Sequence, residues 1–222
     1  MNMQLFLASG NDHKKREIQE LFPNHSITIP KDVGINFDPH ENGLSFFENS
    51  LKKAQELWNI VHKPVLADDS GICVTMLNNR PGIYSARYCG MDAGIGELSL
   101  SSSDQNRLLI EELNSTLNQA GLSEAVKNQR RCFYVCAMVF YYGDFQYSSV
   151  QETLEGELLQ DISQQKGSGG FGYDPIVFLP SLGKTVSELT SEEKNLISHR
   201  GKACSLLRPV IDLFEKQHCA FR

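Results

Sequence analysis

One apolar stretch, PVLADDSGICVTML at residues 64–77, constrains the fold of this chain more than any other. Its composition predicts a buried β-strand, yet Asp68 and Asp69 stand in its middle. A carboxylate that is buried without an ion pair, hydrogen bonds or a metal ion is strongly destabilising. Because the following Ser70-Gly71 pair permits a bend, we expect the strand to leave the core there and to expose its two acids.

The two acids should have different roles, because neighbouring residues of a regular strand point to opposite faces of the sheet. Asp68 and Asp69 could face one ligand together only where the strand ends or bends. Glu41 lies in a polar loop before a predicted helix, and a lone loop glutamate is normally just solvated. If Glu41 faces the strand acids, the three carboxylates suit a hard cation such as Mg²⁺.

Strands and helices alternate along the chain, and no internal repeat or low-complexity linker interrupts them. This order predicts a single α/β domain over residues 1–222, with a mixed sheet flanked by helices and two lobes around a cleft. The predicted strands are residues 3–9, 25–30, 64–77, 130–142, 145–158 and the end of 167–180; the predicted helices are 12–22, 44–61, 104–120 and the segment from about 198.

The spacing of apolar residues defines the buried faces of the predicted helices. From Leu44 to Val61 they recur in steps of three and four, which is typical of an amphipathic helix. Asp104 is the expected N-cap of the next helix. The inward residues expected of the C-terminal helix are Leu206, Leu207, Val210, Ile211 and Phe214.

The composition is that of an ordinary soluble globular chain of 222 residues, with 41% hydrophobic and 22% charged residues. The formal net charge of −6 argues against a broad nucleic-acid footprint. The N-terminus has no signal-peptide pattern and no segment is apolar enough to span a membrane, so we expect a cytoplasmic protein. The six cysteines lack zinc-site spacing and should be reduced, buried thiols.

Two polar segments could bind an anion. The turn in ASGNDHKKRE, at residues 8–17, follows a strand and precedes a helix, so its N–H groups and Lys14 would suit a phosphate. An ordinary capped helix with solvated lysines explains the same residues. Near the C-terminus, Ser198 can cap a helix that starts with His199 and Arg200, where positive charge is unfavourable and favours a negative partner.

A glycine-rich loop, GSGGFG at residues 167–172, matches the dinucleotide pattern G-x-G-x-x-G only formally. The pattern requires a following helix, whereas YDPIVFLP predicts a strand, so we reject a Rossmann site. Phe171 and Tyr173 stand among the glycines and could stack on a base. A mobile surface loop with an aromatic ring tucked into the core is the other interpretation.

The segments SGNDHK, LADDSGICV, PGIYSARY, GFGYDP and SHRGKA occur in this order from Ser9 to Ala203. Together they resemble the motifs of the inosine triphosphatase-like enzymes, which hydrolyse non-standard purine nucleoside triphosphates and are called dITP/XTP pyrophosphatases in bacteria. Five ordered matches over nearly the whole chain make the resemblance specific. It implies Mg²⁺-dependent hydrolysis of ITP, dITP and XTP to the monophosphate and pyrophosphate. It also implies a homodimer with an elongated mixed sheet.

The resemblance also implies roles for individual residues. Asp69 would accept the proton of the attacking water, Glu41 and Asp69 would bind Mg²⁺, and Asp68 would assist. The triphosphate would be bound by Ser9, Gly10, Asn11, Asp12, His13 and Lys14, with Lys53 as a further candidate. Ser70 would touch the substrate, and the base pocket would comprise Phe171, Gly172, Tyr173, Asp174, Lys194, His199 and Arg200.

Selection of the base would depend on hydrogen bonding. Hypoxanthine and xanthine present a carbonyl acceptor at C6, where adenine presents an amine donor. A cationic donor such as Arg200 would pair with the carbonyl and be left unpaired by adenine, and a buried unpaired group is costly. GTP shares that carbonyl, so its rejection would need another group, such as Asp174 or a backbone carbonyl near C2.

Three departures from the family pattern stand out: Ser9 replaces the commoner threonine, His40 precedes Glu41, and the region between Arg87 and Arg131 is longer. Three other functions are compatible with the residues. A related pyrophosphatase could act on other modified or pyrimidine nucleotides. An aspartyl-phosphate phosphatase could use Asp68 or Asp69 as its nucleophile. A nucleotide sensor would bind without turnover.

Overall fold

The computed structural model describes residues 3–90, 100–121 and 129–219. Residues 92–103, whose glycine- and serine-rich composition predicts a loop, fall mostly outside the described residues. The chain divides into two compact units. The first comprises Met1–Asp69, Cys136–Thr153 and Asn195–Arg222, and the second comprises Ser70–Val135 and Leu154–Lys194.

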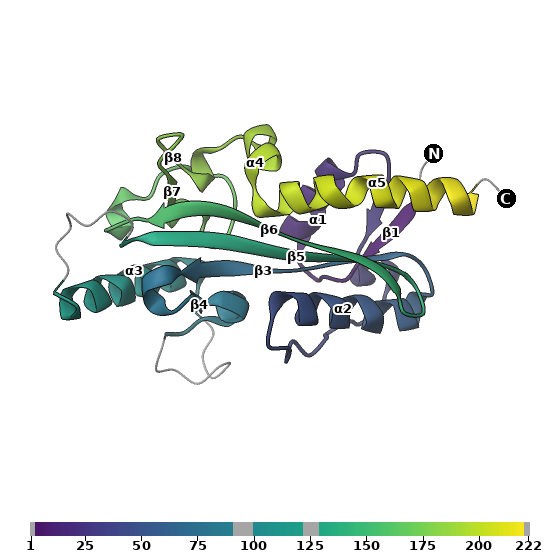
Figure 1. Ribbon diagram of the computed structural model, residues 1–222, viewed down its shortest axis with the longest axis horizontal. Coiled ribbons are helices and arrows are strands. Elements are labelled where there is room, and N and C mark those ends of the chain that lie inside the picture. Colours follow the sequence, from purple (N-terminus) through teal and green to yellow (C-terminus); the bar gives the residue numbers. More distant parts are fainter. Residues whose placement is uncertain (1–2, 91–99, 122–128, 220–222) are drawn as a thin grey trace. The chain divides into compact units, whose positions relative to one another are not determined.

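The described strands form one hydrogen-bonded mixed sheet with the order β2-β1-β3-β5-β6-β7-β8, and β4 pairs with β3 (Figure 1). β1 is parallel to β2 and to β3, whereas the β3–β4, β6–β7 and β7–β8 pairs are antiparallel. This confirms the predicted α/β class. The strands are β1 Gln4–Leu7, β2 Ser26–Thr28, β3 Val65–Val74, β4 Arg80–Pro81, β5 Arg131–Gly143, β6 Gln146–Leu158, β7 Val177–Leu179 and β8 Lys184–Thr185.

All four predicted helices are present, and a short fifth one precedes the last. The α-helices are α1 Asp12–Leu21, α2 Phe46–Val61, α3 Ser102–Gln119, α4 Ser191–Ile197 and α5 His199–Cys219. Asp144 and Phe145 join the neighbouring strands β5 and β6, at the point where the pair Gly143-Asp144 predicts a turn from the sequence. The described cysteines whose side chains are placed carry free thiols, and four of them are buried: Cys73, Cys132, Cys136 and Cys204.

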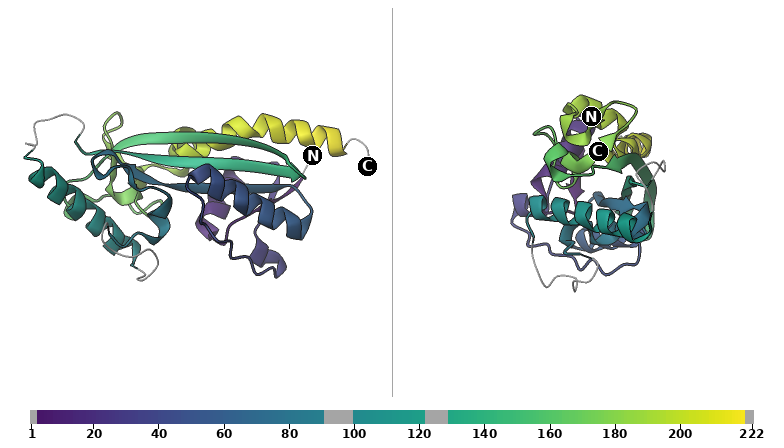
Figure 2. Two further views of the ribbon diagram at one scale, coloured as in Figure 1. Left: turned by 60° about the horizontal axis from the view of Figure 1, so that its bottom comes forward. Right: turned by 90° about the vertical axis from the view of Figure 1, so that its left-hand side faces the viewer.

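Side-chain alternation along the strands gives the first unit two separate apolar layers. Leu5 and Leu66 face one side of the sheet and pack into a cluster with residues of α1 and α5. Phe6 and Ala67 face the other side and pack with residues of α2. The ribbon shows α2 and α5 on opposite faces of these strands (Figure 1 and Figure 2). A polar side chain on one face of β3 therefore lies toward α1 and α5, and one on the other face lies toward α2.

The course of β3 corrects one prediction. The strand does not bend or leave the core at Ser70-Gly71 but runs without a break from Val65 to Val74. Asp68 and Asp69 stay buried, with exposed fractions of 1% and 6%. The strand tolerates these acids because ion pairs reach them from the neighbouring helices, so solvent is not needed to stabilise their charges.

Three predictions about helix ends and faces were also wrong. The N-cap of α3 is Ser101, whose hydroxyl accepts a hydrogen bond from the N–H of Asp104 at 3.1 Å. Leu44 precedes α2 and is 87% exposed, because the helix begins only after its N-cap Ser45. Leu206 is 52% exposed on α5, whereas Leu207 and Ile211 are buried. The 3.6-residue period of the helix cannot turn both Leu206 and Leu207 fully inward.

The second unit has its own buried groups around α3 and the ends of the long strands. Leu109, Ile110 and Leu113 form the buried face of α3. The predicted glycine-rich loop before β7 is confirmed, and Gly167, Gly170 and Gly172 have positive φ angles. The loop closes with the turn Asp174–Ile176, whose residues Asp174 and Ile176 are buried. This arrangement brings a carboxylate into the interior of the second unit.

Candidate active site

The turn between β1 and α1 presents a polar helix start. Asn11 caps α1, and its Oδ1 accepts hydrogen bonds from the N–H groups of His13 at 2.8 Å and Lys14 at 3.3 Å. Ser9 Oγ accepts a hydrogen bond from Asn11 N at 3.1 Å. Gly10, Asn11, Asp12 and His13 are exposed. The first N–H groups of a helix and its dipole favour an anion at this end. Ser9 and Asn11 shape the turn in this structure as acceptors for its backbone.

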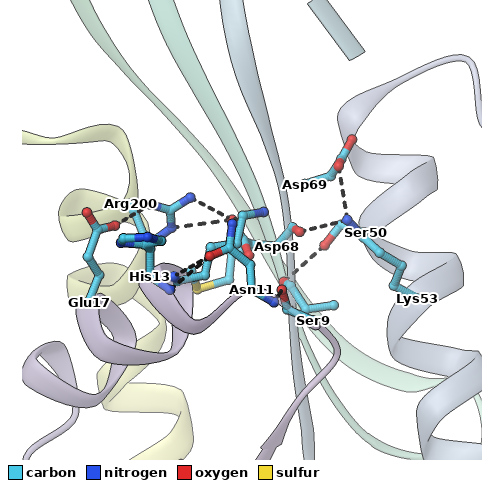
Figure 3. A network of polar contacts seen from close by, with 12 residues as sticks. Ser9, Asn11, His13, Glu17, Ser50, Lys53, Asp68, Asp69 and Arg200 are labelled. Atoms are coloured by element: carbon cyan, nitrogen blue, oxygen red, sulfur yellow. Dashed lines mark hydrogen bonds and ion pairs between the residues drawn. The ribbon is translucent and has the colours of Figure 1, made fainter. Parts of the chain in front are cut away.

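Asp68 continues the face of β3 that packs on α1 and α5, and its partners come from those helices. Its Oδ2 lies 3.1 Å from Lys14 Nζ and 3.0 Å from Arg200 Nη2. Arg200 also forms an ion pair with Glu17 of α1. Figure 3 shows Arg200 and Glu17 on one side of the strand. The four residues Lys14, Glu17, Asp68 and Arg200 form a charge network that we call the Asp68 network.

The electrostatics of the Asp68 network follow from this geometry. Burial disfavours the carboxylate, but the positive charges of Lys14, Arg200 and Lys53 outweigh burial and hold the pKa of Asp68 well below its usual range. Burial likewise opposes the charge of Arg200, while Asp68 and Glu17 raise its pKa. Asp68 is therefore ionised under all ordinary conditions and is a poor proton acceptor.

Asp69 points to the opposite face, toward α2. Its Oδ1 accepts a hydrogen bond from Lys53 Nζ at 3.0 Å, and its Oδ2 accepts one from Asn49 Nδ2 at 3.2 Å. Lys53 Nζ also donates to Glu41 Oε1 at 2.8 Å and to the backbone oxygen of Asp68 at 2.9 Å. Figure 3 shows Lys53 of α2 beside Asp69. We call Glu41, Asn49, Lys53 and Asp69 the Asp69 cluster.

The pKa of Asp69 is shifted in the direction opposite to that of Asp68. Burial raises it, and the negative charge of Glu41 raises it further, although Lys53 acts in the opposite sense. A raised pKa makes the Asp69 carboxylate a stronger base than an ordinary aspartate. The two neighbouring acids thus differ in partners and in proton affinity, as the alternation of a regular strand requires.

The Asp69 cluster is also the part of the first unit where a metal ion would fit. Glu41 and Asp69 both reach Lys53 Nζ, so their oxygens converge on one point. No group of three or more His, Cys, Asp or Glu residues in the described ranges could hold a metal ion. Mg²⁺ often takes only one or two protein carboxylates, with waters and substrate phosphates as its other ligands. The donor set of Glu41 and Asp69 therefore fits such an ion.

In the second unit, Asp174 holds the glycine-rich loop in place. Its Oδ1 accepts a hydrogen bond from Tyr134 Oη at 3.0 Å. Its Oδ2 accepts hydrogen bonds from Lys194 Nζ at 2.9 Å and from Phe171 N at 2.9 Å. Lys194 Nζ lies 5.0 Å from the centroid of the Phe171 ring. Asp174 thus fixes a cation beside a half-buried aromatic ring, a pair that can bind a planar group.

The two aromatic residues of this loop have different environments. Tyr173 is buried, and its hydroxyl donates to the backbone oxygen of Ser85 at 2.9 Å. Phe171 is only half-buried. Gly172, between them, accepts a hydrogen bond through its oxygen from Asn106 Nδ2 at 3.1 Å. Tyr173 is thus the ring tucked into the core, and Phe171 is the more exposed of the two rings.

The start of α5 contains the basic residues that were singled out near the C-terminus of the sequence. Ser198 Oγ accepts a hydrogen bond from Gly201 N at 3.0 Å, which confirms the predicted cap of α5. His199 and Arg200 are buried at the start of this helix. The negative partners expected for Arg200 are present in the chain itself, as Asp68 and Glu17. Ser70 is half-buried on β3, directly after Asp69.

The sequence analysis did not identify four residues that take part in these contacts: Glu17, Asn49, Asn106 and Tyr134. Each lies on the inward or polar side of a helix or strand that was predicted correctly. Their spacing carries no chemical signal, because a single Glu, Asn or Tyr in such an element is usually a surface or core residue. Only the packing of distant segments reveals them.

In the described parts of the chain, no helix combines the length and the apolar character that crossing a membrane requires.

The fold and these networks define a mixed α/β protein in which two adjacent acids of β3 form ion pairs with lysine and arginine residues of α1, α2 and α5. The model of the Ham1 family matches residues 5–210, so this chain belongs to the Ham1 family. The resemblance seen in the sequence motifs is thereby confirmed.

Curated relatives and solved structures agree with this assignment. A dITP/XTP pyrophosphatase of Treponema denticola is 50% identical over 201 residues, covering 90% of this chain and 94% of the relative. Another, from Pectobacterium atrosepticum, is 40% identical over 207 residues, covering 92% and 95%. The structure of a HAM1 protein from Coxiella burnetii aligns with a TM-score of 0.76 at 30% identity, covering 95% of this chain and 98% of that one.

Proposed function

We propose that this chain hydrolyses the non-standard purine nucleoside triphosphates ITP, dITP and XTP to the monophosphate and pyrophosphate. The names of the curated relatives support this activity, since the alignments cover nearly the whole of each chain. The observation that carries the proposal is the pair of adjacent acids on β3. One has a depressed pKa within a network of cations, and the other has a raised pKa beside a second carboxylate.

The phosphate side of the reaction is assigned to the start of α1. Ser9, Gly10, Asn11, Asp12, His13 and Lys14 would surround the triphosphate, with backbone N–H groups and the helix dipole attracting its negative charge. Lys14 would add a full positive charge at a point fixed by its ion pair with Asp68. Asp68 would thus position this lysine and would not itself touch the reacting atoms.

Glu41 and Asp69 would hold Mg²⁺ in the Asp69 cluster. When bound, the ion would neutralise part of the charge on the phosphates and favour attack of water on phosphorus. Both carboxylates contact Lys53 Nζ, and in the described residues no group of three or more His, Cys, Asp or Glu side chains offers a larger set of metal ligands.

Asp69 is assigned as the proton acceptor for the attacking water. A general base works best when its pKa approaches the working pH, and the pKa of Asp69 is shifted in that direction. Asn49 Nδ2 donates to Asp69 Oδ2 at 3.2 Å, which would keep the carboxylate oriented. The depressed pKa of Asp68 and its three cationic neighbours weigh against an aspartyl-phosphate mechanism at that residue.

Recognition of the base is assigned to the glycine-rich loop of the second unit. Phe171 would stack on the purine, and Lys194 would donate to the C6 carbonyl, with Gly172, Tyr173 and Asp174 shaping the loop. Ser70, His199 and Arg200 complete the proposed set. Arg200 pairs with the carboxylates of Asp68 and Glu17, whereas Lys194 pairs with Asp174 of the loop itself and lies beside Phe171, so Lys194 is the better candidate for the cationic donor to the carbonyl.

A homodimer, a cytoplasmic location and the absence of nucleic-acid or membrane partners complete the proposal, on the strength of the motif resemblance and of the acidic composition.

The proposed activity is tested by a substrate panel. Initial rates should be high for ITP, dITP and XTP and low for ATP and GTP. Preference for modified pyrimidine triphosphates would instead favour the related-pyrophosphatase alternative, and binding without turnover would favour a sensor.

A further inference from the structure

Lys53 occupies the centre of the Asp69 cluster. Its side chain is buried, with 6% exposed, and its Nζ contacts three oxygens within 3.0 Å: Glu41 Oε1, Asp69 Oδ1 and the backbone oxygen of Asp68. Burial opposes the charge on this amine, but the carboxylates of Asp69 and Glu41 outweigh burial and raise its pKa. Lys53 is thus a fixed positive charge held by an oxygen set.

This oxygen set is the kind that binds a hard cation. Two carboxylates and a carbonyl oxygen converge on one cationic centre, and Mg²⁺ would draw the same carboxylate oxygens to within about 2.0–2.1 Å. An ammonium group and a divalent ion cannot share that centre, because each requires the same oxygen atoms and they repel each other.

We propose that Lys53 is a built-in counter-ion, which neutralises Glu41 and Asp69 while no metal ion is bound and is displaced from them when a divalent cation binds. The inference rests on the proposed function only in taking these two carboxylates as the metal-binding pair. It adds that the metal-free protein already holds a cation there, so metal binding is an exchange of one cation for another.

The surroundings of Lys53 allow this exchange without rearrangement of the fold. Ser50, one turn earlier on α2, donates through Oγ to the backbone oxygen of Ala67 at 3.0 Å and ties the helix to β3. Ala54, the next residue, is fully buried in the apolar layer. The helix is therefore anchored on both sides of Lys53, while the four-carbon lysine stem can change its rotamer.

The exchange predicts opposite effects on metal affinity and on stability when the charge of Lys53 is removed. In Lys53→Met, Glu41 and Asp69 have lost their shared cation, so the metal-free protein should melt at a lower temperature. The same change removes a competitor of the metal ion. Affinity for Mg²⁺ or Mn²⁺ should therefore rise by about tenfold or more, since even a partly screened charge at this distance exceeds the 1.4 kcal/mol that a factor of ten requires.

The test uses the full chain without nucleotide. Isothermal titration with Mn²⁺ and melting curves with and without Mg²⁺ would compare the wild type, Lys53→Met and the control Lys52→Met. Lys52 is the neighbouring lysine, and its Nζ donates to Asn42 Oδ1 at 2.8 Å, outside the cluster. We expect tighter Mn²⁺ binding by Lys53→Met, a lowered melting temperature that Mg²⁺ restores, and wild-type behaviour of Lys52→Met. Unchanged or weaker metal binding by Lys53→Met, or a melting deficit that Mg²⁺ leaves in place, would overturn the proposal.

A second measurement uses only the wild-type protein, in case Lys53→Met does not fold. An amine-reactive reagent would label the protein with and without Mg²⁺, and mass spectrometry would quantify each lysine. Labelling of Lys53 should rise with Mg²⁺ while labelling of Lys52 stays constant; a constant or falling rate at Lys53 would contradict the exchange. Neither measurement contains nucleotide. A protein that hydrolyses ITP but shows no exchange would refute this inference alone, and the converse result would refute only the proposed function.

Discussion

Asp68 and Asp69 are neighbours on β3, yet their carboxylates lie on opposite faces of the sheet and pair with different helices. Asp68 Oδ2 lies 3.1 Å from Lys14 Nζ of α1, and Asp69 Oδ1 lies 3.0 Å from Lys53 Nζ of α2. The pKa of Asp68 is lowered and the pKa of Asp69 is raised. An uninterrupted strand is therefore sufficient to give two adjacent acids different partners and opposite shifts of their pKa values.

Asp69→Asn should remove the proton acceptor and leave the fold in place. The amide keeps the size of the side chain, and Lys53 keeps its contacts with Glu41 and the Asp68 backbone. We expect kcat for ITP to fall by about 10²–10⁴-fold, the usual contribution of a general base, with a melting temperature near that of the wild type. Steady-state kinetics and thermal melts check this. Wild-type turnover would mean that another group takes the proton, and loss of folding would make Asp69 a structural residue.

Asp68→Asn should instead reduce stability. The change leaves Lys14 and Arg200 without the carboxylate that both contact, and breaking a buried ion pair costs on the order of 3 kcal/mol or more. Urea denaturation at pH 7 measures the difference. A variant as stable as the wild type at this pH would show that Asp68 contributes no net ion-pair energy.

The same variant has a defined pH dependence. The folded pKa of Asp68 lies below the unfolded value of about 3.9, so its contribution is complete above that pH and is lost as the pH falls through the folded value. The stability gap between wild type and Asp68→Asn should therefore be constant from pH 7 to about 5 and narrow at lower pH. A gap that widens on acidification would contradict the assigned direction of the pKa shift.

Tyr134→Phe should loosen the proposed base-binding loop. Burial and the nearby Asp174 raise the pKa of Tyr134 far above its usual value, so its hydroxyl is a permanent donor to Asp174. Losing a hydrogen bond to a charged group costs about 1.5–3 kcal/mol. We expect that loss in urea denaturation and a KM for ITP that rises more than kcat falls. Tyr147→Phe, at a tyrosine that is 39% exposed, is the matched control and should change neither quantity.

Comparison of Gly170→Ala with Gly183→Ala separates the cost of backbone strain from the cost of a steric clash with Asp174. Gly170 has a φ of +73°, and a Cβ there would lie 2.1 Å from Asp174 Oδ2. Gly183 has a φ of +65° with no atom within 4 Å of its would-be Cβ. Gly183→Ala should cost roughly 1 kcal/mol, the price of the left-handed conformation, and Gly170→Ala should cost clearly more. Equal losses in denaturation would show that the loop yields to the extra methyl group.

Much of the fold was predictable because apolar periodicity reports burial directly. Leu5, Leu66 and Leu207 lie in the core where the strand and helix patterns place them. The prediction failed at Asp68 and Asp69, where charged side chains of other elements take the place of solvent around the two carboxylates. The strand was expected to bend at Ser70-Gly71 because buried acids are costly, and the compensating charges, on Lys14 and Arg200, are distant in sequence.

The candidate site shows the same limit. The motif resemblance singled out Asp69, Glu41 and Lys194, but no sequence pattern indicated that Tyr134 and Asn106 support the glycine-rich loop. Those contacts link residues that are 40 and 66 positions apart. A periodic pattern describes one element at a time, so it cannot identify hydrogen bonds between elements.

The central claim is tested most directly by the products of the reaction. The purified protein would be incubated with ITP and Mg²⁺, and the nucleotides and phosphates would be resolved by chromatography. IMP and pyrophosphate in equal amounts are the predicted products, and Asp69→Asn should form neither at a comparable rate. Release of IDP and inorganic phosphate, or no turnover of ITP by the wild type, would contradict the proposed function.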